Sequence, residues 1–157
     1  MSGERRVDAI LLDVDGVLTD GGFYWGPDGE EWKRFCFADV MGISRGMKAG
    51  LIFGLVSGEE SPLVDRYAAK MGITDVYKGC KDKGEAVRDF CARRGLDAGR
   101  VCFMGDDVND LPAFAAAGLS AAPANAQPEV YAQAGIKLQR SGGDGAVREL
   151  IELLLAC

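Results

Sequence analysis

The chain has 157 residues, 48% of them hydrophobic, a formal net charge of −6 and no histidine. This length is enough for one domain with a full hydrophobic core. The lack of histidine excludes Ser-His-Asp and Cys-His catalysis and any imidazole metal site, so carboxylates are the available acids and bases. The acidic charge argues against nucleic-acid binding, and no apolar run is long enough to span a bilayer.

Five cysteines are spread along the sequence without Cys-x-x-Cys spacing: Cys36, Cys80, Cys91, Cys102 and Cys157. An odd number without such spacing favours free thiols in a reducing compartment over disulfides or a zinc site. Residues 1–6 are polar and charged, with no apolar stretch of the signal-peptide type. The sequence therefore predicts a cytoplasmic protein that binds neither membrane nor nucleic acid.

Short apolar runs predict strands over 7–12, 51–56, 75–77, 101–104 and 119–121. Most of these runs are continuous, as in a parallel sheet buried on both faces. Helical patterns lie between them. Asp39 is expected to cap a helix that stops at Gly50, Pro62 to begin a helix that ends at Gly72, and a last helix to cover about 145–155. A further helix carries an apolar stripe of Ala86, Val87, Phe90 and Cys91.

The alternation predicts an α/β fold: a doubly wound, Rossmann-like parallel sheet in a single domain over 1–157. One segment, 21–37, breaks the pattern. It holds aromatic runs on either side of a Pro27-Asp28-Gly29 turn, which is typical of an inserted β-hairpin. The hairpin is expected either to form an oligomer contact or to fold back on its own sheet.

Two carboxylates follow the first predicted strand directly, at Asp13 and Asp15. On an extended chain their side chains would point to opposite sides, but a bend at Gly16 can bring Asp15 back toward Asp13. Paired carboxylates are costly to desolvate unless a cation or a chemical task requires them. The pair therefore indicates a reactive site.

Polar residues at three later places complete a pattern. Ser57 follows the second long apolar run, Lys83 precedes a helical stretch, and an acidic loop, Gly105 to Asp110, follows the run 101–104. Asp-x-Asp, Ser, Lys and Gly-Asp-Asp in this order resemble the four motifs of the haloacid dehalogenase superfamily phosphatases. The resemblance covers nearly the whole chain, and its first and last motifs are the most specific.

The resemblance implies roles for the acidic residues. Asp13 is expected to attack phosphorus and form an aspartyl-phosphate, and Asp15 to protonate the leaving alcohol and then deprotonate water. Mg²⁺ is expected to be held by Asp13, the carbonyl oxygen of Asp15, and Asp106. Asp107 is expected to support this site or to serve as an alternate ligand.

The remaining motif residues are expected to bind the phosphoryl group and to organise the loops. Ser57 and the amide of Gly58 would hold the phosphoryl oxygens, and Lys83 would neutralise their charge. Asn109 and Asp110 would orient the acidic loop and Lys83.

Within the superfamily, residues 13–21 followed by a short hairpin resemble the small, capless phosphatases of 3-deoxy-octulosonate (KDO) 8-phosphate. The glycine-rich segment 141–149 resembles the end of those proteins too. This likeness implies a homotetramer whose hairpins meet at the centre, with a neighbouring subunit in place of a cap, and a phosphorylated sugar acid as substrate. The tail could let Arg148 or the C-terminus reach the substrate, or it could simply cap the last helix.

One position departs from the octulosonate pattern. That branch usually carries Arg after Ser-Gly, where this chain has Glu59. Glu59 together with Lys70 resembles the related branch that acts on the nine-carbon KDN 9-phosphate, so both are expected to contact substrate. Within one helix, eleven residues would separate them by ~16 Å, so they would not pair directly. The alternative is that Glu59 is an exposed acid and Lys70 a partner of the helix dipole.

Two other classes of protein remain to be compared with the phosphatase. A response-regulator receiver also uses acidic residues, a Ser or Thr and a Lys, but it lacks the Asp-x-Asp-Gly spacing and needs no late Gly-Asp-Asp loop. A non-catalytic oligomerisation module, of the kind fused to sialic-acid-activating cytidylyltransferases, would be expected to show degraded motifs. All motifs here are intact, and Asp15 would be dispensable in a scaffold.

Overall fold

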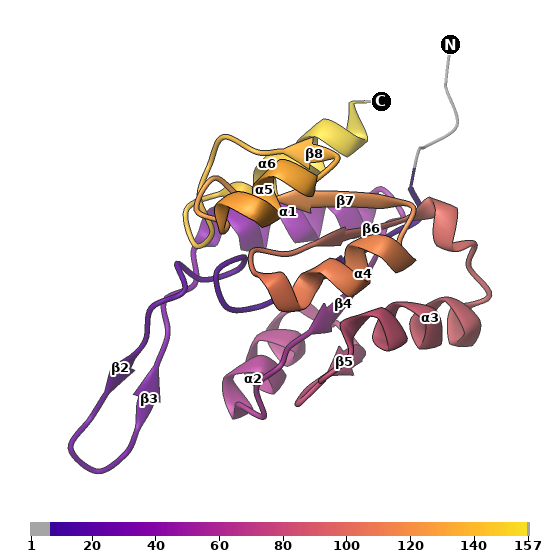
Figure 1. Cartoon of the computed structure of the whole chain (residues 1–157). Coiled ribbons are helices and arrows are strands. Elements are labelled where there is room, and N and C mark those ends of the chain that lie inside the picture. The colour runs from indigo at the N-terminus through magenta and orange to yellow at the C-terminus, as the bar shows by residue number, and fades with distance from the viewer. Residues whose placement is uncertain (1–6, 157) are drawn as a thin grey trace.

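A computed structural model describes residues 7–156, with one six-stranded sheet at its centre (Figure 1). The strands of this sheet are β1 (Ala9–Leu12), β4 (Ile52–Val56), β5 (Asp75–Tyr77), β6 (Val101–Met104), β7 (Leu119–Ala122) and β8 (Ile136–Lys137). Their order is β5-β4-β1-β6-β7-β8, and each neighbouring pair is parallel. The predicted α/β fold with a parallel sheet is confirmed. The sequence did not predict β8, whose two residues are too few to form an apolar run.

The central strand β1 explains why the strands read as continuous apolar runs. Ile10 and Leu12 belong to the core on one face of the sheet, and Ala9 and Leu11 to the core on the other. All four residues are fully buried. Alternate side chains of a strand point to opposite faces, so a strand covered on both sides must be apolar at every position.

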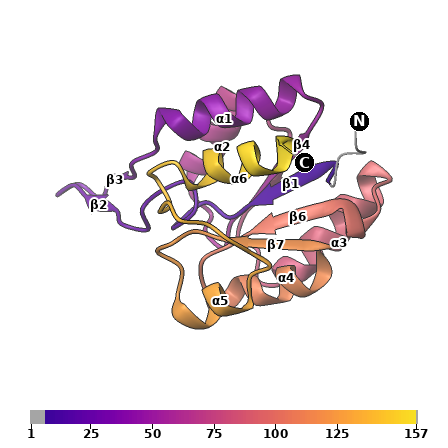
Figure 2. The same ribbon diagram turned by 90° about the horizontal axis from the view of Figure 1, so that it is seen from above.

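Helices cover both faces of the sheet (Figure 2). One layer contains α1 (Phe37–Lys48), α2 (Pro62–Met71) and α6 (Ala146–Leu155), which supply one core. The other face packs against α3 (Lys83–Arg94) and α4 (Leu111–Ala116). The short helix α5 (Pro128–Gln133) packs beside β7. Single 3₁₀ turns occupy Ala98–Arg100 and Val108–Asp110.

Several predicted helix boundaries are confirmed. Pro62 is the first residue of α2, Ser61 caps it, and Gly72 ends it in the left-handed conformation. The prediction that Asp39 caps a helix is wrong. Cys36 is the N-cap of α1, whereas the end of the helix at Lys48, shortly before Gly50, agrees with the prediction.

Asp39 lies inside the first turn of α1 and is fully buried there. Its carboxylate accepts hydrogen bonds from the Cys36 thiol (3.1 Å) and from the backbone N–H of Arg148 (3.0 Å). Asp39 therefore joins the start of α1 to the start of α6, a tertiary contact that local sequence patterns do not predict.

The inserted segment forms the predicted hairpin from β2 (Tyr24–Trp25) and β3 (Glu31–Trp32). Figure 1 shows it projecting from the body of the molecule, so the alternative that it folds back on its own sheet is wrong. Five aromatic side chains of the segment 21–37 are more than half exposed: Phe23, Tyr24, Trp25, Trp32 and Phe37. The insert adds no cap domain over the carboxyl ends of the strands.

The described cysteines and helices agree with the compositional expectations. No disulfide joins Cys36, Cys80, Cys91 and Cys102 to one another, and Cys91 and Cys102 are buried. Within residues 7–156, no helix combines the length and the apolarity needed to cross a membrane. Cys157 and residues 1–6, on which two sequence-based expectations rest, lie outside the described part of the chain.

Candidate active site

The candidate site lies where three adjacent strands end. Asp13 directly follows β1, Ser57 follows β4, and Asp106 lies two residues beyond β6. Because β1 lies between β4 and β6, these residues meet at one edge of the sheet, and the N–H of Asp13 donates to the carbonyl oxygen of Met104 at 3.0 Å. The chain leaves β1 toward β4 and later crosses to β6 on its other side. Open α/β sheets bind ligands at this kind of crossover.

A cavity of about 340 Å³ opens at this edge. Eight of its lining residues belong to the predicted site and the ninth is Gly21: Asp13, Asp15, Gly21, Gly58, Glu59, Lys83, Asp106, Asp107 and Asn109. Ser57 and Asp110 are fully buried beside it and do not line it. The structure thus brings together every predicted site residue except Lys70.

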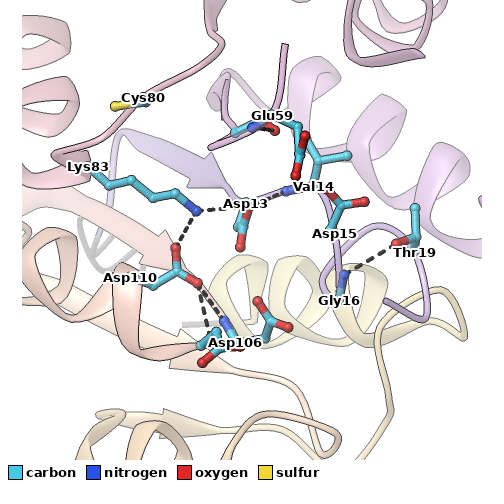
Figure 3. A network of polar contacts seen from close by, with 12 residues as sticks. Asp13, Val14, Asp15, Gly16, Thr19, Glu59, Cys80, Lys83, Asp106 and Asp110 are labelled. Carbon is cyan, nitrogen blue, oxygen red and sulfur yellow. Dashed lines mark hydrogen bonds and ion pairs between the residues drawn. The ribbon is translucent and has the colours of Figure 1, made fainter. Parts of the chain in front are cut away.

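Lys83 is the cation at the centre of this site (Figure 3). It is the first residue of α3, whose N-cap Asp82 accepts hydrogen bonds from the backbone of Gly84 and Glu85. Its ammonium lies 3.1 Å from Oδ1 of Asp13 and 2.8 Å from Oδ1 of Asp110. Burial alone would lower the pKa of Lys83, but the two carboxylates outweigh burial, so the pKa is raised and the side chain stays charged.

Asp110 holds the acidic loop in shape. Its Oδ2 accepts the backbone N–H groups of Asp106 (2.8 Å) and Asp107 (3.2 Å), while its Oδ1 faces Lys83. Gly105 is required here, because a Cβ at that position would lie 2.5 Å from the Asp110 side chain. With both oxygens in use, Asp110 acts as a support for the loop and for Lys83.

The loop after β1 lies in close contact with Asp106. Gly16 adopts a φ of +83°, and a Cβ there would lie 1.8 Å from Oδ2 of Asp106. The buried hydroxyl of Thr19 accepts the N–H groups of Gly16 and Gly21, both at 3.2 Å. The predicted bend at Gly16 is therefore present, and it places Asp15 on the same cavity as Asp13.

The acidic residues repel each other in a poorly solvated place. Burial, followed by the nearby Asp110, raises the pKa of Asp13 well above its ordinary value, although Lys83 opposes the change. Burial also raises the pKa of Asp106 to about 6; Asp110 and Asp107 add to this, and its contact with Asp13 acts in the opposite direction. A second cation beside these oxygens would relieve the repulsion.

The donor set suits a hard divalent cation. Asp13, Asp106 and Asp110 each offer a carboxylate oxygen, and these atoms lie within 4.8 Å of one another. Both oxygens of Asp110 are occupied, by Lys83 and by two amides. Asp13 contacts Lys83 and the N–H of Val14 through Oδ1 alone. Asp13 and Asp106 are therefore the carboxylates with an oxygen available for an ion. Oxygen ligands with room for water and a phosphate oxygen are the environment that Mg²⁺ prefers.

Ser57 shapes the turn opposite the acidic loop. Its Oγ accepts the N–H of Glu59 at 3.0 Å, and its own N–H donates to the carbonyl oxygen of Tyr77. This turn presents Gly58 and the Glu59 side chain to the cavity.

Two residues discussed from the sequence lie elsewhere. Lys70 is near the end of α2, with its ammonium 5.7 Å from the centre of the Phe37 ring, outside the cavity that holds Asp13. Glu59 precedes α2, so the two residues do not share a helix. Arg148 donates to Glu152 at 2.9 Å and does not line the cavity, so within this chain it does not reach the site.

Sequence reasoning missed two residues that hold the loop after β1, residues 13–19. Lys33, on the returning arm of the hairpin, lies 2.7 Å from Oδ1 of Asp15. Asn125 donates to the carbonyl oxygen of Gly16 (3.0 Å) and accepts the N–H of Gly142 (2.7 Å), which joins the loop to the glycine-rich tail. Neither belongs to one of the four motifs. The only sequence signal for Lys33 was its place in an insert directly after the first motif.

Comparison with known proteins agrees with this geometry. Residues 47–150 match a family described as haloacid dehalogenase-like hydrolase. The chain is similar to the 3-deoxy-D-manno-octulosonate 8-phosphate phosphatase of Escherichia coli, with 36% identity over 155 residues, 99% of this chain and 82% of that protein. The corresponding phosphatase of Haemophilus influenzae is 38% identical over 151 residues, 96% of this chain and 84% of that protein.

Solved structures show the same likeness. The octulosonate phosphatase of Moraxella catarrhalis, in complex with magnesium, phosphate and KDO, superposes with a TM-score of 0.93 at 32% identity, covering 97% of this chain and 87% of that one. The cobalt-bound enzyme of Haemophilus influenzae superposes with a TM-score of 0.93 at 37% identity, covering 97% and 89%.

Proposed function

The chain belongs to the haloacid dehalogenase-like hydrolases and is a phosphatase, and on this premise we propose that it hydrolyses KDO 8-phosphate with Mg²⁺ as cofactor. One observation carries the proposal. Asp13, Asp15, Lys83 and Asp106 line a single cavity in a chain that aligns over nearly its whole length with enzymes of that name. Under this proposal residues 1–157 form one phosphatase domain.

The proposed reaction has two steps at the carboxylates. An oxygen of Asp13 attacks phosphorus and forms an aspartyl-phosphate, while the bond from phosphorus to the sugar oxygen breaks and Asp15 gives its proton to that oxygen. Asp15 then takes a proton from water, whose oxygen attacks phosphorus, so that inorganic phosphate leaves and the Asp13 carboxylate is regenerated. Asp15 suits this role because it lines the cavity and its side chain is 34% exposed, whereas Asp13 and Lys83 are nearly buried.

The charge of the phosphoryl group is balanced by Lys83 and by the cation. Asp13, Asp106 and the carbonyl oxygen of Asp15 are the proposed ligands of Mg²⁺, with Asp107 in support; the ion would offset negative charge on the phosphoryl oxygens. Lys83 is already fixed toward the cavity by Asp110. The amide of Gly58 and the hydroxyl of Ser57 are proposed donors to the phosphoryl oxygens, and Asn109 a further polar contact.

Glu59 supports a second candidate substrate, KDN 9-phosphate. Its side chain lines the cavity, where the octulosonate branch is expected to carry Arg, and a carboxylate there would accept hydrogen bonds from sugar hydroxyls. If Glu59 selects the substrate, Glu59→Arg will shift the ratio of kcat/KM toward KDO 8-phosphate. An unchanged ratio would remove the reason for considering the nine-carbon acid. Lys70 remains a proposed substrate contact only across a subunit boundary, because in its own chain it lies outside the cavity.

Self-association as a homotetramer is proposed from the exposed hairpin. Trp25 is 72% exposed and Trp32 62% exposed, which is unusual for large aromatic residues unless a partner covers them. Replacing both with Ser is expected to reduce the mass measured by light scattering. The lack of a disulfide among the four cysteines in residues 7–156 supports the proposed cytoplasmic location.

The direct test measures phosphate release from KDO 8-phosphate, KDN 9-phosphate and simple sugar phosphates in the presence of Mg²⁺. Asp13→Asn is the control, because it keeps the shape of the nucleophile and removes its charge. A kcat/KM that favours KDO 8-phosphate and is abolished in the variant is the expected result. Slow, undiscriminating turnover would contradict the proposed substrate. No turnover by folded, Mg²⁺-bound protein would instead favour a non-catalytic oligomerisation module.

A further inference from the structure

The inserted hairpin supplies a lysine, Lys33, that contacts Asp15, one of the residues lining the active-site cavity. The Lys33 ammonium lies 2.7 Å from Oδ1 of Asp15, and the Lys33 side chain is only 4% exposed. Its second carboxylate neighbour, Glu31, is further away at 3.6 Å. Lys33 is therefore a largely buried charge whose close ion-pair partner is the proposed proton donor.

The hairpin arm holds Lys33 in register with the catalytic loop. Phe35 pairs with Thr19 in an antiparallel bridge, and its ring stacks on Tyr67 with centroids 4.6 Å apart. In an extended arm, Lys33 points to the same side as Phe35, and both line a second cavity beside α1 and α2. Arg34 points the other way and donates to the carbonyl oxygen of Gly143 at 2.9 Å. Contacts on both faces thus fix where the ammonium lies.

We propose that Lys33 is a positioning residue for Asp15: it selects which Asp15 oxygen exchanges protons with the substrate. An ammonium group can only donate hydrogen bonds, so Oδ1 of Asp15 must act as an acceptor toward Lys33. The transferable proton of Asp15 is then carried by Oδ2. In the first step this proton passes from Oδ2 to the leaving oxygen as the bond between phosphorus and that oxygen breaks, and in the second step Oδ2 receives a proton from water.

This inference rests on the proposed phosphatase mechanism and predicts a dependence on the leaving group. A sugar alkoxide is a poor leaving group and needs the proton of Asp15, whereas p-nitrophenolate leaves without one. Lys33→Met is expected to lower kcat/KM for an alkyl phosphate about tenfold to a hundredfold, part of the effect usual for a general acid. For p-nitrophenyl phosphate the loss should stay within about threefold. The ratio kcat/KM is the suitable quantity because it excludes the later hydrolysis of the intermediate.

Two further variants separate positioning from folding. In an Asp15→Asn background, Lys33→Met should cause little additional loss, because Lys33 acts through Asp15. Lys33→Arg keeps a hydrogen-bond donor but places it differently. It should therefore lose more activity toward the alkyl phosphate than toward p-nitrophenyl phosphate. This variant provides the same test if Lys33→Met does not fold. Lys48→Met, on the exposed end of α1, is the matched control.

Equal losses with both substrates in the folded Lys33 variants, or additive losses with Asp15→Asn, would overturn the positioning role. The alkyl and aryl substrates test Lys33 whichever sugar acid is the natural substrate. Failure of wild-type protein to hydrolyse either ester would overturn the phosphatase mechanism itself. Wild-type turnover of both esters but not of KDO 8-phosphate would overturn only the proposed substrate.

Discussion

Replacing Lys83 with Met should destabilise the protein strongly, because it leaves two carboxylates without their cation. The Lys83 side chain is 2% exposed, and its two partners, Asp13 and Asp110, are 8% and 0% exposed. Removing one partner of a buried ion pair costs roughly 3–5 kcal/mol, since the remaining charge stays unsolvated. With a urea m-value of about 2 kcal/mol/M, the midpoint of unfolding should fall by ~2 M.

The assay is urea unfolding at pH 7.5 and pH 5 in the presence of EDTA, because a divalent cation would replace part of the lost charge. Burial already raises the pKa of Asp13, and without Lys83, which opposes this, the pKa rises further. The folded variant then binds more protons than the unfolded chain as the pH falls. The loss of stability of Lys83→Met relative to wild type should therefore be smaller at pH 5 than at pH 7.5. Lys48→Met should shift the midpoint little. A urea midpoint of Lys83→Met within about 0.3 M of that of wild type would refute the reasoning. A loss of stability that is larger at pH 5 than at pH 7.5 would also refute it.

Two further predictions concern Asp106, a proposed ligand of Mg²⁺, and the glycine-rich tail. Asp106→Asn should increase the free energy of unfolding of the metal-free protein at pH 7.5 by about 1 kcal/mol, which raises its Tm by about 2–4 °C. The same substitution should abolish the stabilisation by Mg²⁺. Burial raises the pKa of Asp106 to about 6, so the unfavourable charge is present above that pH and disappears as the pH falls toward 4. Equal Tm values for wild type and Asp106→Asn at pH 7.5, measured by calorimetry, would contradict this prediction. Gly142→Ala should cost about 1–3 kcal/mol and reduce phosphatase activity, because its Cβ would lie 2.0 Å from the Gly16 carbonyl oxygen. Gly135→Ala is the control, since its nearest contact would be 3.5 Å, and equal losses in the two variants would contradict the close approach at Gly142.

Most of the fold could be predicted because the parallel strands are buried on both faces. The residues of β1 and β6 are buried at every position, so each appears in the sequence as a short apolar run. Residues with a strong local conformational preference, such as Pro62 and Gly72, marked the helix ends correctly. Asp39 did not, because its carboxylate bonds to a helix that begins more than a hundred residues later.

The candidate site was predictable to the extent that its residues follow strand ends directly. Asp13, Ser57 and Asp106 could be placed together once β1, β4 and β6 were recognised as strands. Lys33 and Asn125 could not, because their positions depend on how the hairpin and the tail pack against the loop after β1. Distances of this kind are set by tertiary structure and leave no periodic signal in the sequence.

The amide of Asn125 also has a consequence for the order in which the enzyme becomes active during synthesis. Its two hydrogen bonds join the carbonyl oxygen of Gly16 to the N–H of Gly142, two groups that are far apart in the sequence. A nascent polypeptide in which Asn125 and Gly142 have not yet been synthesised can pair β1 with β4 and β6, but it lacks the residues that fix the Gly16 carbonyl group. The proposed nucleophile, Asp13, is therefore synthesised long before Asn125 and Gly142, which complete the loop beside it.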